Sequence, residues 1–298
     1  MNDQWYYKIE IEKNKYTNGR LRHNVSMVRR LLKGLDVTGM SCIDIGTQES
    51  VIPVLLKKRG AGEVYAYDRF DFTNRINKVK KAYDVDFTYL YGILIDNLKD
   101  KLIQTRKDEQ FDLVVFSGIL YHLIDPLGGM AIARSLCKNG GTFIIETSAF
   151  VTNEMALYFN DKGKYYPQTN YFQIGIGLLD YFLRMLHLKP IDYMFRIPPK
   201  NKDIARVTVV CEAQAEGVNT LDDTWMNKPI IKRDFLQKQL NYDTIKNTES
   251  KLNYEQWDKS RLITRESTAS VDLYETTKNC EQTPIFQDLA YLSLKDKY

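Results

Sequence analysis

Short apolar runs and longer amphipathic segments alternate along the first half of this chain. Runs typical of buried strands occupy residues 41–46, 63–68, 86–92, 111–118 and 142–147. Segments with the hydrophobic spacing of helices separate most of these runs, at residues 50–60, 73–84 and 126–141. Such an alternation predicts an α/β fold with a doubly wound, Rossmann-like, mostly parallel sheet.

The pattern changes beyond this region. A helix is predicted at 175–188, followed by strands at 189–197 and 205–213 with only a short turn between them. Strands joined so directly form an antiparallel hairpin, which we place at the edge of the sheet. A parallel sheet that ends in a hairpin resembles the architecture of class I methyltransferases, which use S-adenosylmethionine.

The flanks of the alternating region differ from it in composition. Residues 1–35 are polar and aromatic, then helical, and we interpret them as an N-terminal lid or helical segment. Residues 36–215 form the predicted cofactor-binding domain. Residues 216–298 are rich in charged, Thr and Asn residues with weak apolar periodicity, and we predict a C-terminal extension. Its role is left open between packing on the domain and a homo-oligomer contact.

Composition and charge narrow the class of protein. The 298 residues are 44% hydrophobic and 27% charged, as in proteins with a buried core, and the net charge is only +4. A dedicated nucleic-acid binder usually shows a stronger, clustered basic bias. The four cysteines form no CxxC pair and there are three histidines, so we expect no metal site. Because no signal peptide or membrane-spanning run is evident, we expect a cytoplasmic protein without membrane contact.

The turn after the first strand carries the candidate cofactor chemistry. Asp44-Ile45-Gly46 closes the strand, and Asp68 ends the next strand 24 residues later. A carboxylate there can accept hydrogen bonds from both ribose hydroxyls, while Asp44 can hold water or orient the amino-acid end of a cofactor. The alternative is that Asp44 caps a helix and Asp68 a turn.

The turn lacks the glycines expected at the next alternate positions, which are Gln48 and Ser50. Their loss weakens a pyrophosphate site most, because pyrophosphate needs many free backbone amides. S-adenosylmethionine carries no phosphate, and these side chains can donate hydrogen bonds to its carboxylate. By the topology of such sheets, adenine is expected near the ends of the third and fourth strands. The predicted cofactor-binding residues are Asp44, Gly46, Thr47, Gln48, Ser50, Asp68, Gly92, Ile93, Ser117 and Gly118.

A longer motif suggests a group within the class. Leu120-Tyr121-His122, Pro126, Gly140-Gly141 and Glu146-Thr147 follow one another through the fourth and fifth strands. This order resembles the class I methyltransferases around the tRNA wobble-uridine carboxymethyltransferase, over roughly residues 36–226. The resemblance implies transfer of a one-carbon unit. The altered turn and an N-terminal region that does not align leave tRNA as substrate less supported.

Acceptor-side residues are expected at the same edge of the sheet. His122 and Glu146 are the catalytic candidates, as a general base or as acceptor-orienting groups. Alternatively, His122 is a rim residue bonded to the backbone, and Glu146 forms an ion pair with a lid residue. The segment 156–172 is tyrosine-rich and, in the resembled fold, covers the acceptor pocket. The predicted substrate-binding residues are Tyr121, Tyr158, Tyr165, Tyr166, Asn170 and Tyr171.

Three functional hypotheses follow from these residues. The first is an S-adenosylmethionine-dependent methyltransferase acting on O or N of a small organic acceptor. The second is a tRNA-modifying transferase, which predicts a contiguous basic surface from Arg20 to Lys33 with Lys78, Lys80 and Lys81. The third is a non-catalytic module that keeps the fold, a reading that the altered turn favours.

Overall fold

A computed structural model describes residues 4–20, 22–106, 108–152, 154–161, 165, 170–196, 203–215 and 292–295. Its main feature is a nine-stranded sheet, seven strands of which follow the order β10-β11-β7-β6-β3-β4-β5. The parallel strands are β3 (Ser41–Ile45), β4 (Glu63–Asp68), β5 (Thr88–Tyr91), β6 (Phe111–Ser117) and β7 (Cys137–Phe150). The hairpin of β10 (Leu188–Arg196) and β11 (Ile204–Ala213) pairs antiparallel and places β10 at the edge. The predicted doubly wound sheet with its edge hairpin is confirmed.

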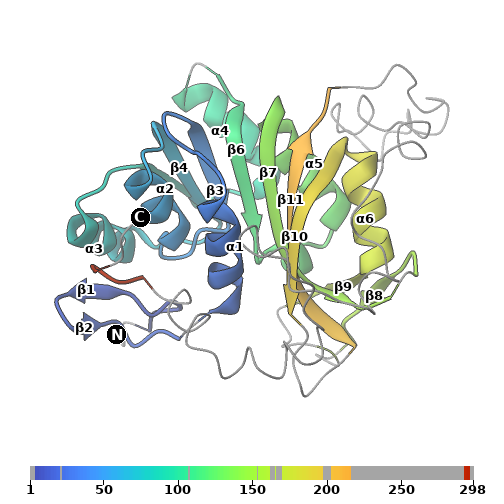
Figure 1. Ribbon diagram of the computed structural model, residues 1–298, viewed down its shortest axis with the longest axis horizontal. Helices are drawn as coiled ribbons and strands as arrows, with labels where there is room; N and C mark the ends of the chain where they lie inside the picture. Colours follow the sequence, from blue (N-terminus) through green and yellow to red (C-terminus); the bar gives the residue numbers. More distant parts are fainter. Residues whose placement is uncertain are drawn as a thin grey trace.

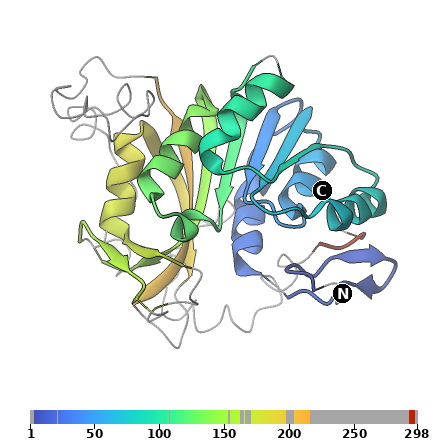
Figure 2. The same cartoon turned by 180° about the vertical axis from the view of Figure 1, so that it is seen from behind.

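Helices cover both faces of the sheet (Figures 1 and 2). One face carries α1 (His23–Lys33), α2 (Val51–Lys58) and α3 (Thr73–Tyr83). The other carries α4 (Leu98–Thr105), α5 (Pro126–Ser135) and α6 (Ile176–Met185). Single-turn helices η1 (Ile95–Asn97) and η2 (Leu120–His122) follow β5 and β6.

The core is divided by the sheet into two clusters, one under each helical layer. Strand residues alternate between them: Phe116 and Phe143 pack with α4, α5 and α6, whereas Val115 and Ile144 pack with α1, α2 and α3. Residues 113–116 of β6 are 0% exposed, which explains why that strand is apolar at successive positions instead of alternate ones.

The boundary between α5 and β7 differs from the prediction. The helix expected over 126–141 ends at Ser135, and the glycine pair lies inside β7. A Cβ on Gly141 would meet the backbone oxygens of Lys138 at 2.8 Å and Asp112 at 3.0 Å. Glycine is therefore required there by close backbone approach within a bulged strand, and not as a helix stop.

Four short strands were not predicted. β1 (Glu10–Glu12) and β2 (Lys15–Tyr16) form a small hairpin in the N-terminal segment. β8 (Leu157–Phe159) and β9 (Phe172–Gly175) lie within the tyrosine-rich segment, and β9 extends the main sheet beside β7. Residues 292–295, red in Figure 1, lie beside β1, where Leu292 pairs with Ile9. The rest of the predicted extension, 216–291 and 296–298, lies outside the described residues, and the domain boundaries stay a prediction.

The described helices include none that is both long enough and apolar enough to cross a bilayer. Cys42, Cys137 and Cys211 are buried free thiols. In the described part of the chain, no group of three or more His, Cys, Asp or Glu side chains has the arrangement of a metal site.

Candidate functional site

The turn after β3 lies against the end of β4. The backbone amides of Gly46 and Thr47 donate to the Tyr67 carbonyl at 2.9 and 3.0 Å, and the Gln48 amide donates to Oδ2 of Asp68 at 2.9 Å. These three hydrogen bonds hold the turn beside Asp68. The two predicted acidic strand ends therefore belong to one site.

The turn keeps a glycine-type backbone path although two expected glycines are absent. The φ angles of Gly46, Gln48 and Ser50 are +90°, +49° and +62°, all in the left-handed region. A residue with a β-carbon is less stable there than glycine by about 1–2 kcal/mol. Because the backbone path is retained, the substitutions at Gln48 and Ser50 change what lines the turn without removing it.

Gly46 is the position at which a side chain is excluded. A Cβ on it would lie 2.3 Å from Cγ2 of Ile119 and 3.2 Å from the Ser117 carbonyl oxygen. Ile119, which follows β6, therefore packs directly on the turn.

The two strand-end acids are buried and interact. Asp44 is 2% exposed and Asp68 is 6% exposed. Burial raises the pKa of Asp44 to about 7, and the nearby Asp68 adds to the rise. Burial also raises the pKa of Asp68, although the amides of Phe70 and Gln48 oppose this by donating hydrogen bonds. Two adjacent acids with raised pKa values, in a turn with a glycine-type path, suit a ligand that brings hydroxyl groups and an ammonium group.

Glu49, which the sequence reading overlooked, ties the N-terminal segment to the turn. Its buried carboxylate accepts hydrogen bonds from the backbone amides of Tyr6 at 2.9 Å and Tyr7 at 3.3 Å. It also pairs with Arg75 of α3 at 3.1 Å. Tyr7 in turn lies near Asp44 and bonds to Asn24. The N-terminal segment is therefore attached to the turn through Glu49, and its role as a lid stays a prediction.

The residues predicted to receive adenine divide into two groups. Gly92 (φ +72°) has open space where a Cβ would be, and the carbonyl of Ile93 accepts a hydrogen bond from Tyr67 at 2.9 Å. Ser117 and Gly118 instead face Glu146: a Cβ on Gly118 would lie 3.8 Å from its Oε2, and the Ser117 hydroxyl is 3.5 Å from the same atom.

Glu146 lies in a buried ion-pair network. Arg206 of β11 donates to both carboxylate oxygens, from Nε at 2.7 Å and from Nη2 at 2.5 Å. Its Nη1 donates to the Tyr121 hydroxyl at 3.1 Å. Burial raises the pKa of Glu146, and Arg206 opposes that rise. A carboxylate held at both oxygens favours the ion-pair alternative over a proton-transfer role. The partner, however, is on the edge hairpin and not on the lid.

His122 lies near Asp68, at the exposed edge of the candidate site. It ends η2, its side chain is exposed, and its positive form would lower the pKa of Asp68 through their electrostatic interaction. Its ring contacts that of Tyr121, with centroids 4.6 Å apart. His122 is therefore placed between Asp68 and the Tyr121–Arg206–Glu146 network.

The substrate-binding residues predicted in the tyrosine-rich segment 156–172 make different contacts. The rings of Tyr158 and Tyr165 contact Phe150, with centroids 4.6 and 5.0 Å away. The Tyr171 side chain is 46% exposed, and its backbone amide donates to the Tyr121 carbonyl at 2.8 Å. Asn170 is buried, and its carbonyl accepts from Asn160. Tyr166 lies outside the described residues.

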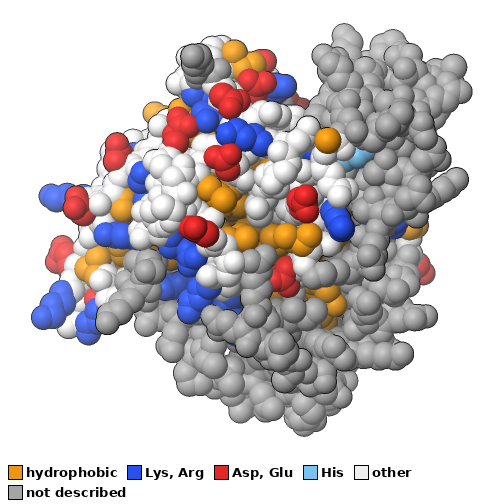
Figure 3. Space-filling view, turned by 45° about the horizontal axis from the view of Figure 1, so that its top comes forward, with side chains coloured by type: hydrophobic (Ala, Val, Ile, Leu, Met, Phe, Trp, Pro, Cys, Tyr) orange, Lys and Arg blue, Asp and Glu red, His pale blue; other side chains and the backbone are white. Residues whose placement is uncertain are grey.

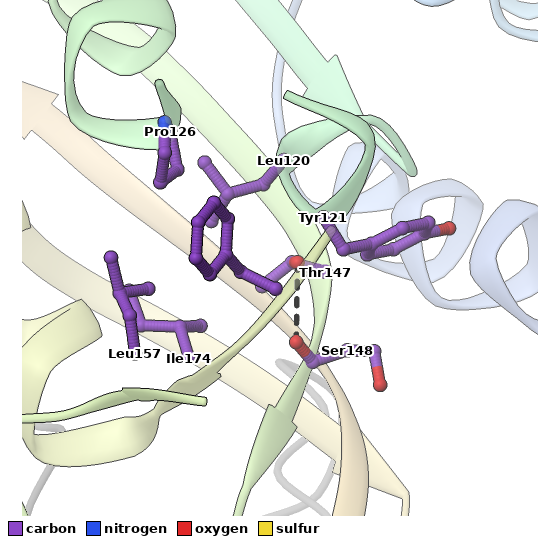
Figure 4. Close-up of a pocket in the computed structure, with 8 residues that line it drawn as sticks. Leu120, Tyr121, Pro126, Thr147, Ser148, Leu157 and Ile174 are labelled. Carbon is purple, nitrogen blue, oxygen red and sulfur yellow. Dashed lines mark hydrogen bonds between the residues drawn. The ribbon is translucent and has the colours of Figure 1, made fainter. Parts of the chain in front are cut away.

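A small apolar pocket lies beneath the lid on the α5 side (Figure 4). Leu120, Leu157 and Ile174 line it, and its volume is about 10 Å³, at most one water molecule. The hydroxyls of Tyr121 and Ser148 point away from these apolar side chains. This pocket is a packing gap and does not accommodate an organic acceptor.

A mostly parallel Rossmann-like sheet with flanking helices and an antiparallel edge hairpin is the class I methyltransferase fold. The family model described as a methyltransferase domain matches residues 15–173, more than half of the chain. The protein belongs to this family. It carries the methyltransferase domain of that family, and the sequence predictions of enzyme class and methyl donor are confirmed at this level.

Individual relatives resemble parts of the chain. Ribosomal protein L11 methyltransferase of Fusobacterium nucleatum subsp. nucleatum is 27% identical over 125 residues, which are 40% of this chain and only 38% of that protein. The crystallised N-terminal domain of EvdMO1, in the presence of S-adenosylhomocysteine and D-fucose, is 15% identical with a TM-score of 0.53, over 71% of this chain and 92% of that one. The same domain with S-adenosylhomocysteine bound has a TM-score of 0.52 and 14% identity, with the same coverage. The likeness to the tRNA wobble-uridine group stays a prediction.

Proposed function

We propose that this methyltransferase acts on O or N of a small organic acceptor, with the donor held between the turn after β3 and the end of β4. The observation that carries the donor site is the joining of Asp68 to the Gly46–Ser50 turn through the Gln48 amide, beside the buried Asp44. The residues present fit the donor, because two carboxyl groups at neighbouring strand ends can accept its hydrogen bonds and the space beside Gly92 is open.

Each residue has a separate task in this proposal. Asp68 binds the ribose hydroxyls, and Asp44, ionised on binding, receives the ammonium end. Gly92 and Ile93 border the adenine. When bound, the donor supplies an electrophilic methyl group, and the protein positions the acceptor in line with it and excludes water. His122, between Asp68 and Tyr121, accepts the acceptor's proton where one is released.

The structure favours a small acceptor over tRNA. Several basic residues of the predicted surface are engaged within the fold: Arg29 is 7% exposed, Arg22 stacks 3.6 Å from the centre of the Tyr6 ring, and Lys80 pairs with Asp86. On the face drawn in Figure 3, acidic and basic side chains are intermixed. A tRNA-binding surface calls instead for clustered positive charge.

Donor binding is tested by calorimetry with S-adenosylmethionine and S-adenosylhomocysteine. We expect saturable binding to the wild-type protein and a loss of at least about tenfold in affinity for Asp68→Ala, because two charge-assisted hydrogen bonds disappear. Asp71→Ala is the matched control, since Asp71 is exposed, lies three residues away and accepts hydrogen bonds from its neighbour Thr73. Equal affinity of Asp68→Ala and wild type would remove the basis of the proposed site.

A further inference from the structure

A row of polar side chains crosses three neighbouring strands at the end of β7. Ser148 of β7 pairs in register with Arg206 of β11, and Glu146 pairs with Thr208. Paired residues share a face of a sheet, and residues two apart on a strand do so as well. On the other side of β7, Ala149 pairs with Ile174 of β9, which places Gln173 on the face of Ser148. We call Glu146, Ser148, Gln173, Arg206 and Thr208 the polar floor.

The floor is buried, and its charges are balanced. Glu146, Ser148, Gln173 and Thr208 are all 0% exposed. The one carboxylate and the one guanidinium of the floor form a two-point ion pair with each other. A charged acceptor would have to compete with that pair for its counter-ion, so the floor suits a neutral molecule.

Three side chains of the floor lack hydrogen-bond partners within the described fold. They are the hydroxyls of Ser148 and Thr208 and both polar atoms of the Gln173 carboxamide. An unsatisfied buried polar group destabilises a protein by about 1–3 kcal/mol, so three in one row call for a reason. Each of the three can both donate and accept a hydrogen bond. A hydroxyl group on an acceptor has the same dual capacity.

Aromatic side chains border the floor. Phe150, two residues after Ser148, lies on the same face and contacts the rings of Tyr158 and Tyr165. The hydroxyl of Tyr121 accepts a hydrogen bond from Arg206 of the floor. Flat aromatic surfaces beside dual-capacity polar groups suit a ring with C–H faces and hydroxyl edges.

We propose that the polar floor is the acceptor-binding subsite of this enzyme and that it recognises a neutral polyhydroxylated ring of the sugar class. The proposal rests on the function proposed above and names its substrate class. The acceptor reaches the floor when β8, whose Tyr158 packs on Phe150, moves away while β9 stays paired with β7. A bond forms between one acceptor oxygen and the methyl carbon as the sulfur–methyl bond breaks; the sulfonium leaves as a neutral thioether, and the hydroxyl proton passes to His122 or to water.

Stability without any ligand gives the first test. Thr208→Val and Ser148→Ala remove hydroxyls that have no hydrogen-bond partner. We therefore expect the midpoint of thermal unfolding of each variant to rise by about a few degrees. The matched controls are Thr17→Val and Ser135→Ala, whose buried hydroxyls do have partners, Tyr7 and Ile132. We expect both control midpoints to fall. A fall for Thr208→Val equal to that of Thr17→Val would show a structural hydroxyl and overturn the proposal.

Ligand binding gives the second test, on protein saturated with S-adenosylhomocysteine. The probes are glucose, galactose and mannose, and each is compared with its uronic acid and its 2-amino sugar. These derivatives introduce a negative or a positive charge and keep the same sugar ring. We expect at least one neutral sugar to bind more tightly than its charged counterparts, and Gln173→Leu and Thr208→Val to weaken it by about tenfold or more.

Three outcomes separate the possibilities. Tighter binding of a uronic acid or amino sugar, or no sugar binding to a protein that still binds S-adenosylhomocysteine, would overturn the polar-floor proposal alone. Failure of the wild-type protein to bind S-adenosylhomocysteine would remove the donor site proposed above, and the unfolding comparison would still decide whether the floor hydroxyls are structural. Unchanged donor affinity in Gln173→Leu is the result expected of a residue that contacts only the acceptor.

Discussion

Replacing Gln48 with glycine should stabilise the protein, an unusual expectation for a substitution beside a proposed cofactor site. At a φ of +49°, the β-carbon of Gln48 is unfavourable by about 1–2 kcal/mol. Glycine removes that strain but makes the unfolded chain more flexible, which opposes the gain by about 0.4–1 kcal/mol. The net expectation for Gln48→Gly is therefore a gain of about 0.5–1 kcal/mol.

Gln48→Ala is the matched control, because it removes the same carboxamide and keeps the β-carbon. We expect it to be less stable than Gln48→Gly by about 1 kcal/mol, a difference of roughly 2–4 °C in thermal midpoint for a chain of this size. Urea unfolding measures the difference directly, and calorimetry with S-adenosylhomocysteine shows whether donor affinity follows the backbone or the side chain.

The contrary result is simple to recognise. If Gln48→Gly unfolds at lower urea concentration than Gln48→Ala, the left-handed conformation is not a source of strain at this position. If donor affinity falls equally in both variants while stability separates them, the carboxamide contacts the donor, as the sequence analysis suggested. The two measurements therefore divide the conformational role of this residue from its chemical role.

Three other predictions concern the buried charges. Because the pKa of Asp44 is raised from 3.8 to about 7, its contribution to the stability of the donor-free protein is present below pH 3.8 and lost as the pH rises through 7. Donor affinity should instead increase over pH 6–8. Asp44→Asn should flatten the stability profile, measured by thermal shift, and the affinity profile, measured by calorimetry. Glu49→Gln should lower stability by about 1–3 kcal/mol and weaken donor binding, since the N-terminal segment loses its charged anchor, and limited proteolysis near Tyr6 should accelerate. Arg206→Met leaves Glu146 buried without a counter-charge, so we expect the free energy of unfolding, measured with urea, to fall by about 3–5 kcal/mol. Adding Glu146→Leu should recover most of the stability and none of the activity.

The sequence predicted the parallel sheet well because its central strands are buried on both faces. The stretch Leu113–Phe116 is apolar for that reason, and it indicates a buried strand even when the neighbouring strands are unknown. The end of α5 was predicted wrongly because a glycine pair is ambiguous. The crowding of Gly141 against the Asp112 carbonyl, which decides the matter, exists only once β6 and β7 are paired.

The candidate site was predictable where one residue defines its own role and unpredictable where a distant partner defines it. Asp44 and Asp68 follow from strand ends. Glu49 was overlooked because its partners, Tyr6 and Tyr7, are 43 and 42 residues away. Arg206 had a usable signal, the single cation within a mostly apolar strand, which implies a buried counter-charge.

The consequence of the absent glycines was also misjudged from the sequence. Gln48 and Ser50 suggested a decayed turn, but the amide hydrogen bonds to Tyr67 and Asp68 fix the same backbone path. Composition alone cannot reveal this, because the hydrogen bonds depend on the neighbouring strand. The effect of a missing glycine therefore has to be judged from backbone angles.

The pairing of residues 292–295 with the N-terminal hairpin bears on how the enzyme matures during synthesis. Glu10 is 1% exposed; one of its carboxylate oxygens accepts from the nearby Asn14 amide, and the other accepts from the Ser293 hydroxyl and the Leu294 amide, 283 and 284 residues later in the chain. The sheet can assemble on the ribosome well before those residues are made, whereas the hairpin that leads into Tyr6 and Tyr7 cannot complete its contacts. Chains that stop ahead of residue 292 should thus carry a formed sheet with an incomplete N-terminal hairpin, and full donor affinity should require residues 292–295.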